Sequence, residues 1–564
     1  MKKSNSLNLQ KNSFAFLPLG GANEIGMNLN MYHHEGKWII IDCGVGFADE
    51  EIPGVTLLTP KIDFIIQNKD KICGLVITHI HEDHIGAIAY LWNYIKCPVY
   101  CTPLARSFLE FKLKDRGYNP DRDVKITELT SSNRIFHVGP FQLEALGITH
   151  SVPEMLGLKI ETPFGPIFHT GDWKFDDKPV VGQATNYKTL KEFGKNGIYA
   201  IVCDSTNVFN AGSSGSEGDL EKNLINIVKK QENRVVITTF ASNLARLHTI
   251  AAVAAKTKRK LVVAGFSLWR IISIARKNGY LLDDIHDFYE AEDANSLDRK
   301  DVIILCTGCQ GEPTSALSKM AVGEHKVRIQ SGDTVIFSSK IIPGNDKKIF
   351  GIFNKLTDKD INIITERAHH VHVSGHPNRD ELKKMYSLLN PRFSIPVHGE
   401  QYHIAEHAEL ARSFGVEEAY RVKNGDVLEF FSDGIKKVGT VTHGRMCIDG
   451  TILRDSTSLV IEQRRKISDS GAVFVNVILS SNENFVFAPV FEMPGFLDQN
   501  EDLDLYKQLE TLARAEIADI IENYNQSVKS KEAEVKYKIE NRLSKIFMKY
   551  TGKSPLIKAF VKII

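Results

Sequence analysis

The sequence predicts an α/β fold in which short buried strands alternate with helices. Two observations support this prediction: apolar runs separated by turn signals over residues 14–203, and further apolar runs that alternate with helical segments over residues 235–306. Such alternation is typical of sheets covered by helices. A third observation, two amphipathic helical patterns near the C-terminus, predicts an additional α+β domain at residues 451–564.

The first region, residues 14–208, contains apolar runs bounded by turn residues, as strands require. We expect strands at Phe14–Pro18, Trp38–Cys43, Ile72–Thr78, Arg134–Val138, Phe141–Leu146, Leu158–Glu161, Ile167–Thr170 and Ile198–Cys203. The run Ile72–Thr78 leads into polar residues, and Ile85–Tyr94 then has helical composition. The implied unit is a strand, a loop with ligand-type side chains, and a helix.

Residues 209–365 read as a second α/β domain inserted into the first. The insertion starts at the Gly/Ser-rich segment NAGSSGSEGD, and its expected strands are Val235–Thr239, Leu261–Ala264 and Val302–Cys306. Over residues 366–450 the strand-to-ligand-loop pattern returns, so we expect the chain to re-enter the first domain there. Residues 1–13 form a polar tail.

The C-terminal segment shows two strand patterns followed by two helical ones. We expect strands near Ala472–Ser480 and Asn484–Val490, and helices around Leu505–Ile520 and Val535–Tyr550 with apolar residues at helical spacing. These helices face the core of a small domain, an arrangement that is compatible with a role in dimerisation.

The composition is that of an ordinary globular chain. Of the 564 residues, 43% are hydrophobic and 25% charged, which excludes a disordered or disulfide-stapled protein. With Lys+Arg 70 and Asp+Glu 69, the chain is not a wholly basic nucleic-acid-coating protein. This balance is compatible with a local basic channel. We expect a cytoplasmic protein with no membrane association and with its eight cysteines reduced.

The strongest chemical signal is the segment Thr78–His84, with the sequence THIHEDH. In an extended segment residues i and i+2 point to the same side, so His79 and His81 can converge on one metal ion. Asp83 and His84 follow at the helix entry and can face a second ion. Three imidazoles beside two carboxylates indicate a cation that neutralises and orients them.

Further ligand-type residues stand at the ends of apolar runs elsewhere. His150 follows Leu146–Ile148, Asp172 follows the expected strand Ile167–Thr170, and His398 follows the run that ends at Val397. A carboxylate such as Asp172 can bridge two ions. Together with the first motif, these residues predict a dinuclear metal site.

This pattern resembles the metallo-β-lactamase superfamily, whose HxHxDH loop, later His, later Asp and final His supply two metal sites. The resemblance implies an αββα sandwich, with His79, His81 and His150 on one ion, Asp83, His84 and His398 on the other, and Asp172 bridging. It also gives Asp42 a supporting role behind the loop. Nitrogen and oxygen ligands without thiolate favour zinc, with manganese as the alternative.

The resemblance narrows to the β-CASP branch and to the ribonuclease J family. That branch carries an inserted domain before the last metal histidine, and Asp204, His376 and His398 match its additional motifs. The stretches that carry the resemblance are GGANEIG, DSTN, TTFASN, TGCQGEP, GDTVIFSSKIIPGND, HVSGH and IPVHGE. The chain departs from the family pattern at Ile80, Ala22–Asn23, Cys309, Pro377 and Gln401–His403, where the last replaces a usual Tyr-Arg after HGE.

The family resemblance implies a metal-dependent ribonuclease that works 5′-to-3′ as an exonuclease and also as an endonuclease, in mRNA decay and ribosomal RNA maturation. Asp83, Asp204 and His376 are the expected catalytic residues, with His376 donating to the leaving oxygen or phosphoryl group. The expected partners are RNA, further copies of the chain in a dimer or tetramer, and an RNA helicase or the ribosome.

We also expect a cradle for a 5′-monophosphate in the segment HVSGH. The Ser374 hydroxyl, the backbone around Gly375 and the His376 ring can converge on one anion, and glycine permits a close backbone approach. His372 and, from the inserted domain, Ser242 complete the predicted set. The alternative is a plain turn in which Ser374 caps the following helix.

Three other functions compete with the ribonuclease hypothesis. A thioesterase or lactonase would share the HxHxDH loop but has no use for a domain-sized insertion. A DNA-directed β-CASP nuclease differs in its substrate. A non-catalytic scaffold subunit would be expected to have lost metal ligands, and this sequence keeps every one of them.

Overall fold

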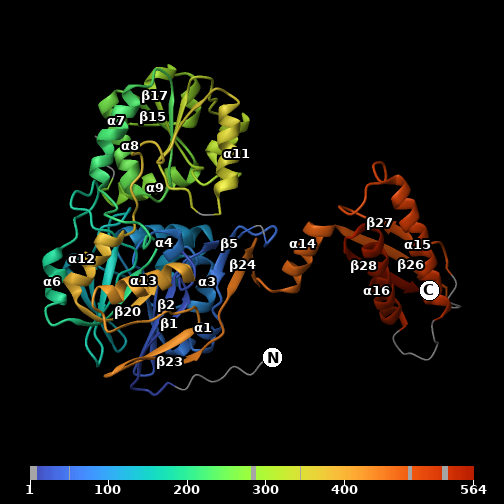
Figure 1. Cartoon of the computed structure of the whole chain (residues 1–564), viewed down its shortest axis with the longest axis horizontal. Coiled ribbons are helices and arrows are strands. Elements are labelled where there is room, and N and C mark those ends of the chain that lie inside the picture. Colours follow the sequence, from blue (N-terminus) through green and yellow to red (C-terminus); the bar gives the residue numbers. More distant parts are fainter. Residues whose placement is uncertain (1–8, 50, 281–286, 343, 481–484, 524–530) are drawn as a thin grey trace. The chain divides into compact units, whose positions relative to one another are not determined.

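The computed structural model shows several α/β sheets arranged in two compact units (Figure 1). It describes all residues except 1–8, 50, 281–286, 343, 481–484 and 524–530, so most of the predicted polar tail lies outside the described residues. One unit comprises Met1–Gly46 and Thr59–Gly444, and the other Phe47–Leu58 and Arg445–Ile564. None of the described helices is long and apolar enough to span a membrane.

Two large sheets form the first part of the first unit. The eight-stranded sheet has the order β23 (Gly434–Thr440), β22 (Asp426–Phe431), β1 (Phe14–Gly20), β2 (Leu29–His34), β3 (Lys37–Ile41), β6 (Ile72–Val76), β7 (Val99–Cys101) and β8 (Ile126–Glu128). The seven-stranded sheet has the order β21 (Glu418–Ala419), β20 (Pro391–Val397), β13 (Ile198–Asp204), β12 (Ile167–His169), β11 (Leu156–Ile160), β10 (Phe141–Gly147) and β9 (Ile135–Val138).

The two sheets share one apolar core. Phe16 and Ile39 from the first sheet and Leu158 and Ile395 from the second are fully buried in the same cluster. Burial of this kind is the main favourable contribution to folding, at about 25 cal/mol per Å² of apolar surface. Strand β1 is buried along its whole length, as expected for a strand that is covered on both faces.

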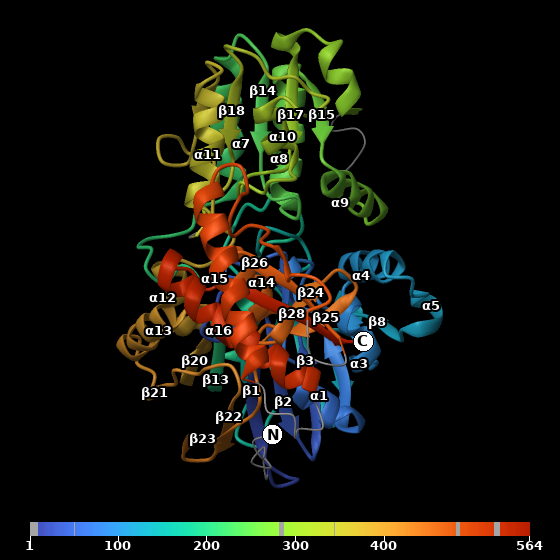
Figure 2. The same cartoon turned by 90° about the vertical axis from the view of Figure 1, so that its right-hand side faces the viewer.

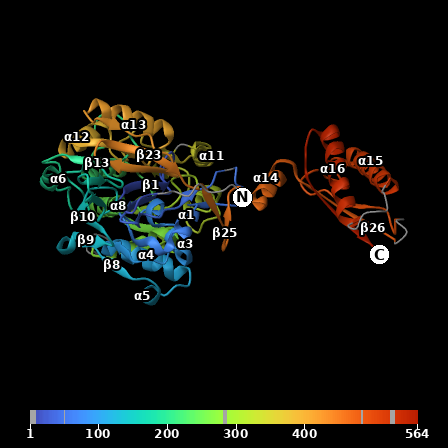
Figure 3. The same cartoon turned by 90° about the horizontal axis from the view of Figure 1, so that it is seen from below.

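Helices cover the outer faces of this sandwich. One group is α1 (Asp63–Gln67), α2 (Glu82–Ile85), α3 (Ile88–Ile95), α4 (Pro103–Asp115) and α5 (Pro120–Asp123); the other is α6 (Tyr187–Phe193), α12 (Arg379–Leu389) and α13 (Gln401–Ser413). A second core packs Leu190, Leu382 and Ala408 of the latter group against Phe168 and Ile201. Figure 3 shows α12 and α13 on one side of β1 and β13, with α3 and α4 on the other. The αββα sandwich is confirmed.

The inserted region is a parallel sheet between helices. Its strands have the order β16 (Phe288–Glu290), β15 (Lys260–Ala264), β17 (Val302–Cys306), β14 (Val235–Thr238), β18 (Thr334–Phe337) and β19 (Asn362–Ile364), and every pair is parallel. Its helices are α7 (Glu217–Lys229), α8 (Leu244–Thr257), α9 (Phe266–Lys277), α10 (Ala316–Val322) and α11 (Asp346–Thr357), which flank the sheet in Figure 2. This confirms the predicted α/β insertion.

The second unit contains a segment that the sequence analysis assigned elsewhere. A four-stranded sheet has the order β25 (Ile452–Asp455), β24 (Arg445–Asp449), β5 (Leu57–Pro60) and β4 (Gly46–Phe47). Residues Phe47–Leu58 therefore group with the C-terminal part of the chain. A pairing between segments almost 400 residues apart leaves no trace in local periodicity.

The C-terminal α+β domain buries its own helices. α15 (Leu503–Glu522) and α16 (Lys531–Thr551) pack on the sheet β27 (Val490–Glu492), β26 (Ala472–Leu479) and β28 (Leu556–Ile563), with Leu509 and Leu543 fully buried; α14 (Leu459–Ser470) precedes them. The core-facing reading of these helices is confirmed. The strand expected at Asn484–Val490 was misplaced: it begins at Val490, and Asn484 lies outside the described residues.

Candidate metal centre

The predicted metal ligands lie on loops that follow strand ends. β6 leads into the segment Thr78–His84, β12 leads to Asp172, and β20 leads to His398. Because β12, β13 and β20 are parallel neighbours, their carboxyl ends meet at one edge of the sheet, where ligand sites of α/β proteins form. Asp204 is the last residue of β13 and therefore stands at the same edge.

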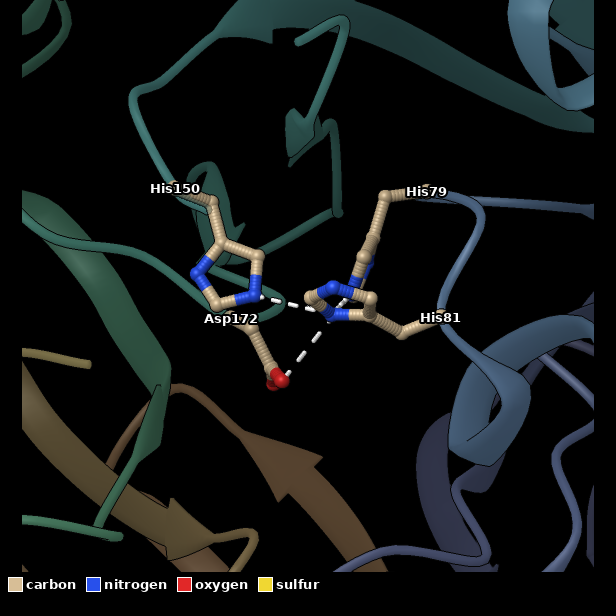
Figure 4. Close-up of side chains that lie close together, drawn as sticks. All are labelled: His79, His81, His150 and Asp172. Carbon is tan, nitrogen blue, oxygen red and sulfur yellow. Dashed lines mark hydrogen bonds and ion pairs between the residues drawn. The ribbon is translucent and has the colours of Figure 1, made fainter. Parts of the chain in front are cut away.

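Three imidazoles meet in the first half of the site (Figure 4). Nδ1 of His81 lies 3.0 Å from Nε2 of His79 and 3.0 Å from Nε2 of His150. Asp172 approaches the same group, with Oδ2 4.0 Å from Nε2 of His79. Figure 4 shows the three rings and the Asp172 carboxylate turned towards one another. All four ligand atoms lie within 4.8 Å of each other.

The second half of the site combines carboxylates with two further rings. Nε2 of His84 lies 3.1 Å from Oδ2 of Asp172, and Nε2 of His398 lies 3.2 Å from Oδ2 of Asp83. These four residues also bring one ligand atom each within 4.8 Å of the others. Asp172 belongs to both halves, in the position expected for a bridging carboxylate. The structure thus brings all seven predicted ligands together.

Hydrogen bonds that lead to Asp42 fix the orientation of the His79 and His84 rings. They are made by Nδ1, the ring nitrogen that faces away from the cluster. The Thr78 hydroxyl donates to Asp42 (2.8 Å), so it accepts from Nδ1 of His79 at 3.0 Å. Nδ1 of His84 lies 2.7 Å from the same Asp42 oxygen. Both rings therefore turn Nε2 towards the centre, as partners behind metal-binding histidines generally arrange. Asp42 adopts the left-handed backbone region, with φ +62°.

His150 and His398 are oriented in the same way from other segments. Nδ1 of His150 donates to the Gly375 carbonyl at 2.6 Å. The Thr206 hydroxyl donates to Asp204, so its oxygen accepts from Nδ1 of His398 at 2.7 Å. In each ring the remaining nitrogen faces the cluster. His398 holds this position with φ +53°, a conformation that is costly for a residue with a side chain and is typical of functional sites.

The charges of the two halves differ. Burial lowers the pKa of His79 and His150 well below the ordinary value, and that of His81 to about 4, so these rings are neutral and offer lone pairs. Although burial also acts on His398, the carboxylates of Asp172, Asp204 and Asp83 outweigh it and raise its pKa to about 10. A divalent cation would satisfy these carboxylates in place of ring protons. The donor set therefore fits divalent metal binding.

Asp204 and His376 form a hydrogen-bonded pair beside the cluster. Nδ1 of His376 lies 2.7 Å from Oδ2 of Asp204, and the other oxygen of Asp204 accepts from the Thr206 amide and hydroxyl. The His376 ring stacks on His398 at 5.5 Å with an angle of 16°. Asp204 is buried, whereas 22% of the His376 side chain is exposed. The pair presents one ring nitrogen, Nε2, free of Asp204.

The predicted phosphate loop is held in place by a residue that sequence reasoning missed. Nδ2 of Asn207 donates to the Ser374 hydroxyl oxygen (2.7 Å) and to the His376 carbonyl (3.1 Å). The His376 amide also donates to Ser374 Oγ, at 3.2 Å, so this amide is not free for an anion. A side chain at Gly375 would meet His150 at 2.7 Å, which explains why the loop needs glycine here.

His372 and Ser242 lie at the edge of this arrangement. His372 turns Nδ1 to within 3.4 Å of the Arg246 guanidinium of α8, in the inserted region. Ser242 precedes the same helix, and Ala245 donates to the Ser151 carbonyl next to His150. Hydrogen bonds from Ser242 or His372 to Ser374 are not among those of the described residues, so their part in the cradle stays a prediction.

Four family models match successive parts of the chain. Residues 28–185 match the metallo-beta-lactamase superfamily, and residues 232–356 match the description "Ribonuclease J, beta-CASP domain". Residues 360–422 match the RNA specificity domain of Zn-dependent metallo-hydrolases, and residues 459–562 match the ribonuclease J C-terminal domain. The first and third of these ranges both contribute strands to the seven-stranded sheet of the sandwich.

Curated relatives extend over nearly the whole chain. A ribonuclease J of Sinorhizobium meliloti is 39% identical over 91% of this chain and 92% of its own length. The chain belongs to the ribonuclease J family. A ribonuclease J 1 of Streptococcus pyogenes is 32% identical over 98% of both chains, and a ribonuclease J of Helicobacter pylori is 34% identical over 96% of this chain and 78% of its own.

Membership of the ribonuclease J family confirms the recognition made from the motifs and makes the chain a metal-dependent ribonuclease that binds RNA. It removes the thioesterase, lactonase and scaffold alternatives. A solved structure of a protein of unknown function from Enterococcus faecalis matches 74% of this chain and all of its own, with a TM-score of 0.51 and 16% identity. That likeness supports the fold alone.

Several polar residues of this ribonuclease J site carried no signal in the sequence. Asn28 donates to the Asp83 carbonyl and lies 3.0 Å from Nε2 of His84, and Ser151 lies 3.2 Å from Nε2 of His81. Thr206 and Asn207 hold His398 and Ser374. Thr206 and Asn207 belong to the motif DSTN that begins at Asp204, and this motif was the one sequence signal that pointed to them.

Proposed function

We propose that this ribonuclease degrades RNA from the 5′ end as a 5′-to-3′ exonuclease that prefers a 5′-monophosphate, and that it also cuts internally. The observation that carries this proposal is the position of the loop Ser374–His376. It is hydrogen-bonded to His150 through Gly375 and to Asn207 through Ser374, so a terminal phosphate bound there lies next to the metal centre.

Two divalent ions fit the two halves of the cluster. We assign His79, His81 and His150 to one ion and Asp83, His84 and His398 to the other, with Asp172 between them. Zinc is the favoured metal and manganese the alternative. When bound, two such ions supply stabilisation of the charge that develops on the attacking and leaving oxygens of an in-line displacement at phosphorus.

The chain's own groups then position the RNA and handle the proton. Asp204 accepts from Nδ1 of His376 and so keeps Nε2 of that ring turned away from it, available to the leaving oxygen or a phosphoryl group. Although burial lowers the pKa of His376, the negative charges of Asp204 and Asp172 raise it, which favours a ring that can donate.

Ser374 is the central donor of the proposed phosphate cradle. Its oxygen accepts from two N–H groups, of Asn207 and His376, so the hydroxyl hydrogen is left to donate to an anion. A monophosphate satisfies this donor, whereas a 5′-hydroxyl end leaves it unpaired, and we propose that the cradle does not accept the larger triphosphate. Internal cleavage needs no terminal phosphate, so it bypasses this selection.

The wider role we propose is that of the family: mRNA decay and ribosomal RNA maturation in the cytoplasm. We propose a homo-oligomer, a dimer or tetramer, with an RNA helicase or the ribosome as further partners. The apolar faces of α15 and α16 are buried in their own domain, so we propose that other surfaces form the oligomer interface. The domain limits we propose are 14–208, 209–365, 366–450 and 451–564, with Phe47–Leu58 of the first range grouping with the last.

The deciding experiment compares three forms of one single-stranded RNA, carrying a 5′-monophosphate, a 5′-triphosphate or a 5′-hydroxyl. An internal label reports mononucleotide release and a 3′ label reports internal cuts. The expected result is fastest mononucleotide release from the monophosphate form and equal internal cleavage of all three. Equal mononucleotide release from all three ends would overturn the end preference.

Metal dependence is tested on the same substrates. Chelation should abolish both products, and addition of zinc or manganese to the stripped protein should restore them. Elemental analysis of the purified protein gives the number and kind of ions per chain. A stoichiometry of one ion per chain at full activity would overturn the two-ion assignment.

A further inference from the structure

A pair of stacked aromatic rings lies exposed next to the metal centre. The rings of Phe209 and Tyr402 are 4.4 Å apart with an angle of 20° between their planes. Tyr402 is 72% exposed and Phe209 37%. His403 meets the edge of Phe209 at 5.3 Å. Single exposed aromatic residues are common, but two rings from distant segments that stack and remain exposed form an organised flat surface.

The two segments that carry these rings are the ones that hold the reactive side chains. The segment that follows β13 places Thr206 on His398 and Asn207 on Ser374 before it reaches Phe209. Tyr402 lies in the first turn of α13, four residues after His398. The aromatic pair is therefore four residues along the chain from a predicted metal ligand, and two residues from the residue that holds the phosphate loop.

Close packing fixes the two segments against each other. A side chain at Gly399 would lie 2.8 Å from Cβ of His403 and 3.1 Å from Cβ of Ser205, so glycine lets α13 approach the segment directly. Arg379 adds a second connection: its Nε donates to the Val208 carbonyl at 2.8 Å and its guanidinium pairs with Glu406 of α13. Both rings thus stand on supports that the metal centre shares.

A rigid exposed aromatic face beside an RNA-cleaving centre suits one kind of occupant. Every nucleobase has a flat π-face, and a base that stacks on an aromatic side chain is bound without regard to its identity. Phe209 covers one face of the Tyr402 ring, and the exposure of Tyr402 leaves the other face to solvent. The chain is a ribonuclease, so unpaired bases are present wherever its substrate lies.

We propose that Tyr402, backed by Phe209, is a stacking subsite for an unpaired nucleobase of the RNA, within a few nucleotides of the bond that is cut. The subsite makes no sequence-specific hydrogen bond, and it contributes binding rather than chemistry. It requires only the ribonuclease activity of the family, and is independent of the proposed preference for a 5′-monophosphate.

The test uses the full-length metal-loaded protein and a set of single-stranded RNAs in which one nucleotide is replaced by an abasic residue at successive positions. For wild type, kcat/KM should fall about tenfold at one position, because stacking on an aromatic side chain is lost there. In Tyr402→Ala, KM for the intact RNA should rise about tenfold with kcat within about twofold, and the abasic profile should become flat at that position. Tyr402→Phe and Tyr402→Trp keep an aromatic face and should behave like wild type.

The control is Tyr94→Ala, which removes an exposed tyrosine from α3 and should leave both KM and the abasic profile unchanged. Metal content and melting temperature of each variant show that the centre and the fold are intact. A Tyr402→Ala protein with unchanged KM and an unchanged abasic profile overturns the stacking subsite while the ribonuclease assignment stands. Unchanged kinetics with an altered oligomer mass would assign the surface to a protein contact, and would equally overturn the proposal. If wild type cut none of these RNAs, the ribonuclease function itself would fail.

Discussion

The metal centre and the loop Ser374–His376 are neighbours, yet different kinds of contact hold them. In the metal centre, His84 is fixed from behind by Asp42 at a strand end of the sandwich, and His79 by the Thr78 hydroxyl that bonds to the same carboxylate. The loop is held by the Asn207 side-chain amide. His372, which precedes the loop, is held by Arg246 of the inserted region.

This difference separates chemistry from substrate placement. The ligands all belong to the sandwich, whereas the residues that lead to the phosphate loop also contact the buried Arg246 guanidinium of the inserted region. Loss of a ligand should therefore remove every activity, and changes around the loop should alter which RNA ends are accepted. Variants of a metal ligand and of the residues around the loop test this separation.

His81→Ala should abolish both modes of RNA hydrolysis. The substitution removes the ring whose Nδ1 lies 3.0 Å from both His79 and His150, so one ion loses a ligand. Metal stabilisation is worth several kcal/mol, so kcat should fall by about a thousandfold or more, together with metal content. Assays of RNA cleavage and elemental analysis measure both. His137→Ala, at an exposed histidine of β9, is the matched control, and near wild-type cleavage by His81→Ala would contradict the metal assignment.

Arg246→Met should destabilise the fold by about 3–5 kcal/mol. The guanidinium is fully buried and bonds to both oxygens of Glu217 and to Ser338, so its removal leaves a carboxylate buried without its partner. Denaturant unfolding measures the loss. The double variant with Glu217→Gln should recover part of it, because no charge then remains. Arg122→Met, which breaks an exposed pair with Asp123, should leave stability unchanged.

Much of the metal centre could be predicted because its ligands obey local rules. His79 and His81 alternate along an extended segment, and Asp172 and His398 stand at strand ends where parallel neighbours must meet. The fold class followed from a similarly local signal, the alternation of short apolar runs with helical segments. Such signals are contained in a few consecutive residues, whereas the assignment of each ligand to one of two ions came from the resemblance to the metallo-β-lactamase superfamily.

The supporting residues could not be predicted because their partners are distant. Asn207 is an ordinary loop residue until the fold brings it to Ser374, 167 positions away. Arg246 looks like one charge of a solvated helix, but it is fully buried against Glu217. The pairing of Phe47–Leu58 with the C-terminal unit is likewise a contact of high sequence separation, without any local pattern.

His407 should make the scaffold of the metal centre sensitive to acid. Its ring is fully buried between Ser205, next to Asp204, and Tyr386, and burial lowers its pKa from 6.5 to about 4. Between these values the unfolded chain binds a proton that the folded chain does not. The contribution of the neutral buried ring to the free energy of unfolding is therefore complete above pH 6.5 and is lost as the pH falls towards 4.

The measurement is the free energy of unfolding of wild type and His407→Gln at pH 7 and pH 5. Wild type should lose about 2 kcal/mol more than the variant between these two values, because the variant lacks the titrating ring. An equal loss in both proteins would show that the buried ring does not titrate in this window.

Ser374→Ala should narrow the difference between RNA ends without stopping catalysis. The hydroxyl donates one hydrogen bond to the terminal phosphate, and such a bond is worth about 1 kcal/mol, so the preference for monophosphate over hydroxyl ends should shrink about fivefold. Internal cleavage should stay within about twofold, because the substituted hydroxyl is not a metal ligand. The paired rates on the two RNAs give the ratio, with Ser132→Ala, at an exposed serine, as control. An unchanged ratio would mean that Ser374 only shapes the turn with Asn207, and the separation of chemistry from end recognition would then have to rest on other residues.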